Sequence, residues 1–498
     1  MNTSKFLVSV VIAATAMFST CNVLVAQPAS RTETPEEFKN TNSPQAKMLD
    51  RLLCYLTIDS QSIDDPDPNS FPLTDGQRKI AHHIYDEVKS FGGKDVKVTL
   101  SDSYYVYVEI PSNIKRDVPS VLFMTHLDVT PEAPGKGIKP MVHYNFDGGD
   151  ILLPAGITLS PNTPQGAHLK ELIGKTIVTS DGSTLLGTDD KAGVAVLVSL
   201  IENLVKNPKI KHGPVMLCFS QNEDVGKAQQ AYQPEIFGVR PDIVIDVDGD
   251  SYDRFSVANF TAECYSYHFH GNKAHPSHGL ENRYADALSA SCSFVGLIPP
   301  TLHPSSSSGT EGYLHCYYMN HPVDSTGHPI ESDYEIRVRL RYFNETDGEY
   351  QRKLLEDNLR KTQEAFPFVK SFRTSAVLQY GNVSNSMPKY VPGLVQKGAH
   401  DAGMEIKPEY ARGGSTSGML VTKFPDSLPG GTCIYSGQNA EHSVFEFCCV
   451  EELIQLVDVV KNIVAECTKI IDVKGASQTQ GKLQPTNKKP RRLPHGVD

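Results

Sequence analysis

The stretch Val118-Pro-Ser-Val-Leu-Phe-Met-Thr-His-Leu-Asp-Val129 is an apolar run that leads into a histidine and an aspartate. We expect a strand here, and side chains alternate along a strand, so His126 and Asp128 point the same way. His126 can then offer one ring nitrogen to a metal ion while Asp128 holds the other. A His-x-Asp triplet alone is more often a surface or core coincidence, so its meaning depends on the rest of the chain.

Four further apolar segments lead into acidic residues or histidine. In an open α/β sheet, sites form outside the carboxyl ends of the strands, so residues that follow several strands meet there. Two aspartates at a helix start can also be capping residues, although capping explains one aspartate better than two. The segments are 176–180 before Asp189 and Asp190, 214–220 before Glu223 and Asp224, 243–249 with Asp246 and Asp248, and 432–435 before His442 and Glu446.

The predicted edge therefore gathers two histidines and several carboxylates. Imidazole and carboxylate ligands together favour zinc, with manganese or cobalt as substitutes. One aspartate can bridge two ions about 3.5–4 Å apart. We expect two Zn²⁺ per chain, with Mn²⁺ or Co²⁺ able to replace them.

The order of these motifs resembles the co-catalytic zinc aminopeptidases and carboxypeptidases, and among them the peptidase T family of tripeptide aminopeptidases. The stretch Ser180-Asp-Gly-Ser-Thr-Leu-Leu-Gly-Thr-Asp-Asp-Lys-Ala-Gly193 is close to that family's version, and the similarity runs from about residue 48 to about residue 470. Further matching segments are Val129–Lys136, Gly148–Leu152 and Arg412–Gly414.

The resemblance implies a role for each metal-site residue. Asp189 would bridge the two ions. Glu223 would be the general base, beside the metals without binding them. The other ligands would be His126 and Asp248 for one ion, and Asp224 and His442 for the second.

The resemblance also implies a lid residue that acts between subunits. His275 matches a lid histidine that helps stabilise the oxyanion from the partner subunit, so we expect a homodimer. A histidine before a proline in a loop is otherwise often a surface residue, and the sequence alone favours that reading.

This chain departs from the family at one metal ligand and on the substrate side. Asp224 stands where the family has Glu, and Asp250 stands where it tends to have Gly. Asp250 adds negative charge where a peptide amine could bind. Arg341 or Arg412 is expected to hold the peptide's carboxylate, because guanidinium matches carboxylate bidentately. Alternatively, either arginine pairs with a nearby Asp or Glu.

Composition and chain ends restrict partners and location. The 498 residues carry a net charge of −11, which argues against nucleic acid as a partner. Residues 1–26 have a Lys-bearing start and a short apolar run, which predict a signal peptide and export. Cys21 raises the alternative of a lipid anchor, although the preceding residues are a poor lipobox. No later segment is long and apolar enough to be inserted stably in a membrane.

The predicted fold is α/β, with a catalytic domain built on a central mixed sheet flanked by helices, and an inserted smaller α/β lid and dimerisation domain. The catalytic domain is discontinuous, and the tail is expected to be disordered. The predicted domains are 36–258 with 382–475 for catalysis, 259–381 for the lid and 476–498 for the tail. The predicted helices are 76–92, 282–297, 347–365 and 450–470.

Three functions fit these features. The first is a dizinc aminopeptidase that acts on tripeptides and other short peptides. The second is a dipeptidase, carboxypeptidase or N-acyl amidohydrolase with the same metals. The third is a non-catalytic peptide-binding protein, against which the retained Glu223 argues, because a binder has no need of a base.

Overall fold

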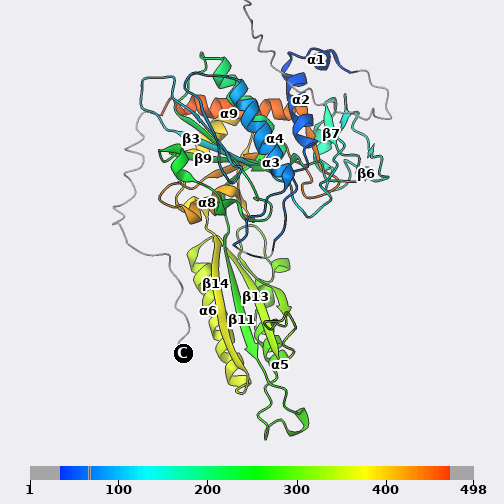
Figure 1. Cartoon of the computed structure of the whole chain (residues 1–498), viewed down its shortest axis with the longest axis vertical. Coiled ribbons are helices and arrows are strands. Elements are labelled where there is room, and N and C mark those ends of the chain that lie inside the picture. Colours follow the sequence, from blue (N-terminus) through cyan, green and yellow to red (C-terminus); the bar gives the residue numbers. More distant parts are fainter. Residues whose placement is uncertain (1–33, 66, 68, 471–498) are drawn as a thin grey trace, which may run out of the picture.

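The computed structural model describes residues 34–470 except 66 and 68 (Figure 1). The predicted signal peptide 1–26 and tail 476–498 lie outside the described residues. The described part forms a broad upper region, from which a long, narrow unit extends downward (Figure 1).

A mixed sheet of eight strands forms the centre of the upper region. Its strands are β1 (Lys97–Leu100), β2 (Val106–Ile110), β3 (Val121–His126), β8 (Val215–Ser220), β9 (Ile243–Gly249), β10 (Arg254–Asn259), β15 (Lys407–Ala411) and β16 (Thr432–Tyr435). They lie in the order β1-β2-β8-β3-β9-β16-β10-β15. The adjacent strands β8, β3, β9 and β16 are mutually parallel, so their carboxyl ends share one edge.

The central strands are apolar because both faces of the sheet are covered. Every residue of β3 is buried. Val121 and Phe123 pack into the larger core cluster, whereas Leu122 and Met124 pack into a second cluster on the opposite face. A strand buried on both faces reads as a continuous apolar run, which is the pattern of residues 118–123.

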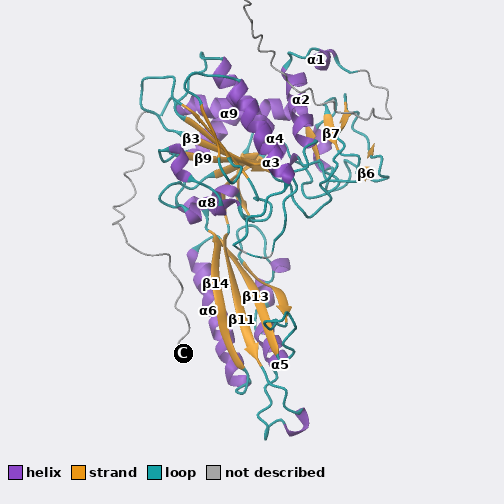
Figure 2. Cartoon of the chain, in the orientation of Figure 1, coloured by secondary structure: helices purple, strands orange, loops and turns teal. Residues whose placement is uncertain are grey.

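Helices cover the two faces unequally (Figure 2). The larger core cluster contains residues of α2 (Pro44–Leu56), α3 (Asp75–Ser90), α4 (Thr188–Lys206), α7 (Val391–Asp401) and α9 (Val450–Cys467). On the opposite face the cluster includes Leu420 of α8 (Thr416–Lys423). A short α1 (Glu36–Lys39) precedes α2. This arrangement confirms the predicted α/β class with a central mixed sheet flanked by helices.

A second sheet forms the narrow unit, with strands in the order β12-β13-β11-β14. We call it the lid sheet. Two helices pack against one face, where Tyr265, Tyr267 and Phe269 are buried. Its elements are β11 (Thr261–His270), β12 (Tyr313–Asn320), β13 (Asp333–Tyr342), β14 (Lys370–Tyr380), α5 (Ala287–Gly296) and α6 (Glu345–Ala365).

The predicted helices are present, with shifted ends. The helix predicted over 76–92 is α3, whose start is fixed by a capping box between Thr74 and Gln77. The helix predicted from 282 begins instead at Ala287, because the Asp286 side chain accepts a hydrogen bond from the Ser289 N–H and caps it there.

One predicted strand does not belong to the main sheet. The segment 176–180 contains β7 (Ile177–Thr179), which lies in a separate three-stranded sheet between β17 (Phe447–Cys449) and β4 (Met141–His143). Asp189 and Asp190 are therefore not delivered by a strand end of the main sheet. They lie at the start of α4, and the expectation that all five strands converge from one sheet was wrong for this segment.

Smaller features complete the fold. A two-stranded sheet joins β5 (Ile151–Leu152) to β6 (Thr158–Leu159). The nine cysteines of the described residues are all free thiols. No helix in the described ranges has the length and apolar character to cross a membrane.

Candidate metal centre

The predicted ligands gather where the four parallel strands end. His126 is the last residue of β3, Asp224 follows β8, Asp248 lies near the end of β9, and His442 lies in the loop after β16. Parallel pairing places these ends side by side, so residues spread over more than 300 positions meet at one edge.

Asp189 reaches this edge from the first turn of α4. The backbone is not helical at Asp189 (φ −81°, ψ 104°) or Asp190 (φ −117°, ψ 31°). Gly193 allows α4 to lie directly on β9, because a Cβ at this position would lie 2.3 Å from the carbonyl oxygen of Val247. This close contact brings Asp189 beside Asp248.

The two carboxylate oxygens of Asp189 face different histidines. Asp189 Oδ1 lies 2.9 Å from His126 Nε2, and Asp189 Oδ2 lies 3.1 Å from His442 Nε2. His126 Nε2 also lies 3.5 Å from Asp248 Oδ1, and His442 Nε2 lies 3.0 Å from Asp224 Oδ1. Two tetrahedral zinc ligands with bonds near 2.0–2.1 Å lie about 3.3 Å apart. The structure thus brings the residues of both predicted ligand sets together, with Asp189 in contact with both histidines.

The negative charge of the carboxylates in this cluster favours the binding of cations. Hydrogen bonds to Asp189 and Asp224 raise the pKa of His442 to about 12. Burial opposes the charged form of His126, but Asp248, Asp128 and Asp189 together raise its pKa well above the usual value. A divalent ion bound at each histidine would supply that positive charge in place of the ring proton.

Unpaired oxygen atoms also fit the metal assignment. Asp224 Oδ2 is buried and, within the described part of the chain, has no hydrogen-bond partner. Burial raises the pKa of Asp224 and of Asp248 to about 7, so each carboxylate requires a positive neighbour to remain ionised. The residues present therefore suit a divalent metal cofactor.

Asp190 lies in the same cluster but has a different role. Its oxygens accept hydrogen bonds from the Thr125 hydroxyl, from the His126 N–H at 3.4 Å and from the Gly193 N–H at 3.2 Å. These contacts hold the end of β3 against the start of α4. Although it lies within ligand distance of His126 and Asp248, its oxygens are already occupied, so it positions the ligands.

Asp128 is fully buried beside His126, as the strand alternation predicts. His126 Nδ1 lies 3.0 Å from the Asp128 carbonyl oxygen and 3.5 Å from its carboxylate Oδ1. The shorter contact shows that the backbone carbonyl is the main partner of Nδ1. Asp128 Oδ1 also accepts the Glu223 N–H at 3.2 Å, so Asp128 positions both the first histidine and the turn that carries Glu223.

Glu223 lies beside the ligands with its carboxylate unpaired. Within the described residues, its side chain has no hydrogen-bond partner. Burial raises the pKa of Glu223 well above its usual range, and the neighbouring charges of Asp248 and Asp224 raise it further. This half-buried, unpaired carboxylate is therefore available to accept a proton.

Two glutamates that received no role from the sequence position the His442 loop. Glu446 accepts hydrogen bonds from the N–H groups of Leu186, Gly187 and His442, and so ties this loop to the segment before Asp189. Glu132 lies 2.9 Å from His442 Nδ1. In the sequence, Glu446 could have been recognised by its position four residues after His442. In the structure, His442 lies in a tight loop and has a positive φ of 57°.

A cavity of about 550 Å³ opens beside the metal centre. Its lining includes Asp248, Asp250, Glu409 and Glu441, and one wall carries Arg412. Asp250 is exposed to the cavity, so this predicted substrate residue lies where a ligand could reach it. The volume is within the range of small-ligand sites.

The two predicted arginines differ in their surroundings. Arg341 is 8% exposed and donates to the carbonyl oxygens of Glu263 and Leu340 and to Gln379 Oε1, so its guanidinium is already held by the lid sheet. Arg412 lines the cavity and also donates to Ser307 and to the carbonyl oxygens of Gly309 and Glu311. Arg412 therefore joins the catalytic region to the lid. Of the two predicted arginines, only Arg412 lines the cavity.

The structure does not bring His275 to the metal centre within one chain. β11 starts at Thr261, next to the main sheet, and ends at His270, and ten residues of strand span about 33 Å. The segment that follows β11 lies at the far end of the lid sheet (Figure 1). His275 is exposed there and accepts a hydrogen bond from the Ser277 N–H.

The sequence is similar to several proteins named peptidase T. It is 30% identical to peptidase T of Clostridium acetobutylicum over 425 residues, which cover 84% of this chain and 98% of that protein. It is 28% identical to peptidase T of Bacillus pumilus over 419 residues, which cover 84% and 97%. No protein-family model matches the chain.

Solved structures share the fold. The aminopeptidase PepT of Bacillus cereus aligns with a TM-score of 0.64 at 18% identity, covering 85% of this chain and 99% of that one. A dinuclear metal-binding peptidase of the M20 family from Bacillus subtilis aligns with a TM-score of 0.52 at 10% identity, covering 85% and 98%. The chain therefore has the fold of these peptidases, with candidate ligands for a divalent metal at the edge of its sheet. The chain belongs to the peptidase T family.

The first prediction concerns Glu446. We expect Glu446→Ala to weaken metal binding at the His442 site by about 10–100-fold, because residues that orient a ligand usually have effects of this size. The site of His126 and Asp248 should be affected less. Glu446→Gln keeps an acceptor oxygen and is the matched control. Titration of the metal-free protein with zinc measures both sites, and equal weakening of the two would contradict the positioning role.

Proposed function

We propose that the protein is a zinc-dependent aminopeptidase that removes the first residue of tripeptides and other short peptides. The observation that carries this proposal is the Asp189 carboxylate shared between two ligand sets, with the unpaired Glu223 carboxylate beside them. Membership of the peptidase T family supports the choice of substrate.

The residues suit hydrolysis of a peptide bond. Divalent ions held by these residues would polarise the peptide carbonyl and acidify the attacking water. Glu223 accepts the proton of the attacking water and then gives it to the departing amine. Asp128 keeps the turn with Glu223 beside His126, through the 3.2 Å hydrogen bond to the Glu223 N–H.

The cavity supplies opposite charges for the two ends of a short peptide. Asp250, Glu409 and Glu441 give its metal side a negative lining that suits a free α-amine. Arg412 lines the same cavity and supplies positive charge for the peptide carboxylate, while its guanidinium also donates to Ser307, Gly309 and Glu311. The departure at Asp250 lies on this substrate side, so it concerns which peptides are accepted more than the chemistry.

The second prediction tests which end of the substrate is recognised. We expect a free tripeptide to be cleaved fastest, its N-acetyl form not to be cleaved, and its C-terminal amide to be cleaved more slowly. Initial rates with the three peptides, followed by chromatography of the products, measure this order. Equal cleavage of the acetylated peptide would exclude an aminopeptidase and favour a carboxypeptidase or N-acyl amidohydrolase with the same metals.

Two further parts of the proposal concern assembly and location. The protein works as a homodimer in which His275 of one chain completes the active site of the other, since His275 cannot reach the metals of its own chain in this structure. The protein is exported by its first 26 residues, as predicted from their sequence. Fractionation of cells that express the full chain tests export, and activity confined to the cytosolic fraction would contradict it.

The third prediction tests the role of His275 between subunits. His275→Ala and Glu223→Gln chains, each inactive alone, should regain about a quarter of wild-type activity after subunit exchange, because half of the dimers are mixed and each has one complete site. His278→Ala, a histidine of the same segment, is the control and should stay active. Absence of recovery after verified exchange would mean that His275 does not act in trans.

A further inference from the structure

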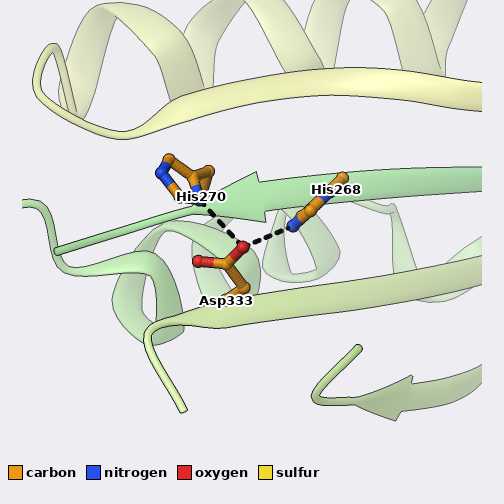
Figure 3. A group of neighbouring side chains, drawn as sticks. All are labelled: His268, His270 and Asp333. Carbon is orange, nitrogen blue, oxygen red and sulfur yellow. Dashed lines mark hydrogen bonds and ion pairs between the residues drawn. The ribbon is translucent and has the colours of Figure 1, made fainter. Parts of the chain in front are cut away.

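A second group of metal-ligating side chains lies on the lid sheet, at its far end. His268 and His270 belong to β11, and Asp333 is the first residue of the neighbouring strand β13. Figure 3 shows both imidazole rings directed at the carboxylate of Asp333. None of these residues belongs to the metal centre described above.

The strand geometry explains why the three side chains meet. His268 and His270 are two residues apart on one strand, so their side chains leave the same face of the sheet. Asp333 lies opposite His270 in the antiparallel register of β11 and β13, and so occupies that face too. This is the open face, because the alternating residues Tyr267 and Phe269 pack toward the helices.

The distances fit a shared cation. His268 Nε2 lies 3.0 Å and His270 Nδ1 lies 2.8 Å from Asp333 Oδ2. One potential ligand atom from each residue lies within 4.8 Å of the others. Tetrahedral ligands at zinc bond lengths are about 3.3 Å apart, so small rotations of three side chains open a site.

Burial and neighbouring charge also favour a site. The Asp333 side chain is only 4% exposed, whereas His270 is 56% exposed. The Asp333 carboxylate is buried in the sheet, and the His270 imidazole is open to solvent. An ion can therefore reach the carboxylate from the solvent side. Glu335, opposite His268, is paired with Arg337 at 2.7 Å, and Lys370, opposite His270, is exposed, where water and salt screen its charge.

We propose that His268, His270 and Asp333 bind one divalent transition-metal ion in each lid, independently of the two ions of the catalytic centre. Two imidazole nitrogens and one carboxylate oxygen suit zinc, with cobalt, nickel or copper as substitutes. The fourth position faces solvent. The ion would join the last residue of β11 to the first residue of β13, at the base of the segment that carries His275.

Metal content of the full chain tests this proposal. Wild type, His270→Ala and His278→Ala are dialysed against the same buffered zinc solution and analysed by mass spectrometry. His270→Ala should hold one zinc ion fewer per chain than wild type. His278→Ala removes an exposed histidine of the same lid that lies outside the cluster, so it should match wild type. Equal zinc in all three proteins would overturn the proposal.

A second variant separates loss of the site from loss of fold. Asp333→Asn keeps the shape of the side chain and removes its charge, and it should also hold one zinc ion fewer while its circular dichroism matches wild type. With Co²⁺ in place of zinc, the visible absorption of wild type should exceed that of both cluster variants. Wild-type zinc content and cobalt spectrum in Asp333→Asn and His270→Ala would show that these residues bind no metal.

Discussion

Glu223→Gln is expected to keep the fold and both catalytic ions and to lose turnover by about 10²–10⁴-fold, the usual contribution of a general base. The amide has nearly the same shape as the carboxylate but cannot accept the proton of the attacking water. The native carboxylate has no hydrogen-bond partner within the described residues, so the change breaks no contact of its side chain. The loss should therefore appear in kcat, with metal content and thermal stability unchanged.

The matched control is Glu409→Gln. Glu409 lines the same cavity but pairs with Arg254 at 3.4 Å, and in the described part of the chain it makes no hydrogen bond or ion pair with the predicted metal ligands. It should leave kcat close to wild type and change KM at most. If Glu223→Gln kept more than about half of the wild-type activity, the proton would have to move to another group, and the assignment of the base would be wrong.

The centre of the main sheet could be predicted because its strands β8, β3 and β9 are buried on both faces. Such strands read as apolar runs, and the polar residue at the end of each run marks the edge where the site forms. His126, Asp224 and Asp248 follow this rule. Asp189 was recognised through its sequence motif, but the element that carries it was predicted wrongly. It lies at the start of α4, which Gly193 allows to pack closely on β9, whereas β7 belongs to another sheet.

Contacts between segments far apart in sequence could not be predicted. Glu446 reaches Leu186 and Gly187 across about 260 positions, and nothing local in the chain marks that contact. The lid cluster was missed for the same reason. His268 and His270 are close in sequence, but Asp333 joins them only through the pairing of β11 with β13.

Asp189→Ala tests the bridge itself, and we expect it to lose both catalytic ions together. Each of its oxygens serves a different ligand set, at 2.9 Å from His126 Nε2 and 3.1 Å from His442 Nε2. The matched variants are Asp248→Ala and Asp224→Ala, each of which removes a ligand from one set only. Each should lose one ion preferentially, whereas Asp189→Ala removes the shared ligand and activity with it.

These ions are best counted in the His270→Ala background, so that an ion in the lid does not enter the total. After gentle dialysis, mass spectrometry should find both catalytic ions in the parent, about one in Asp248→Ala and in Asp224→Ala, and almost none in Asp189→Ala. One ion retained at full affinity in Asp189→Ala would refute the bridge. It would mean that a ligand set survives without Asp189. Asp190 lies within ligand distance of His126 and Asp248, but its oxygens already accept hydrogen bonds from Thr125, His126 and Gly193.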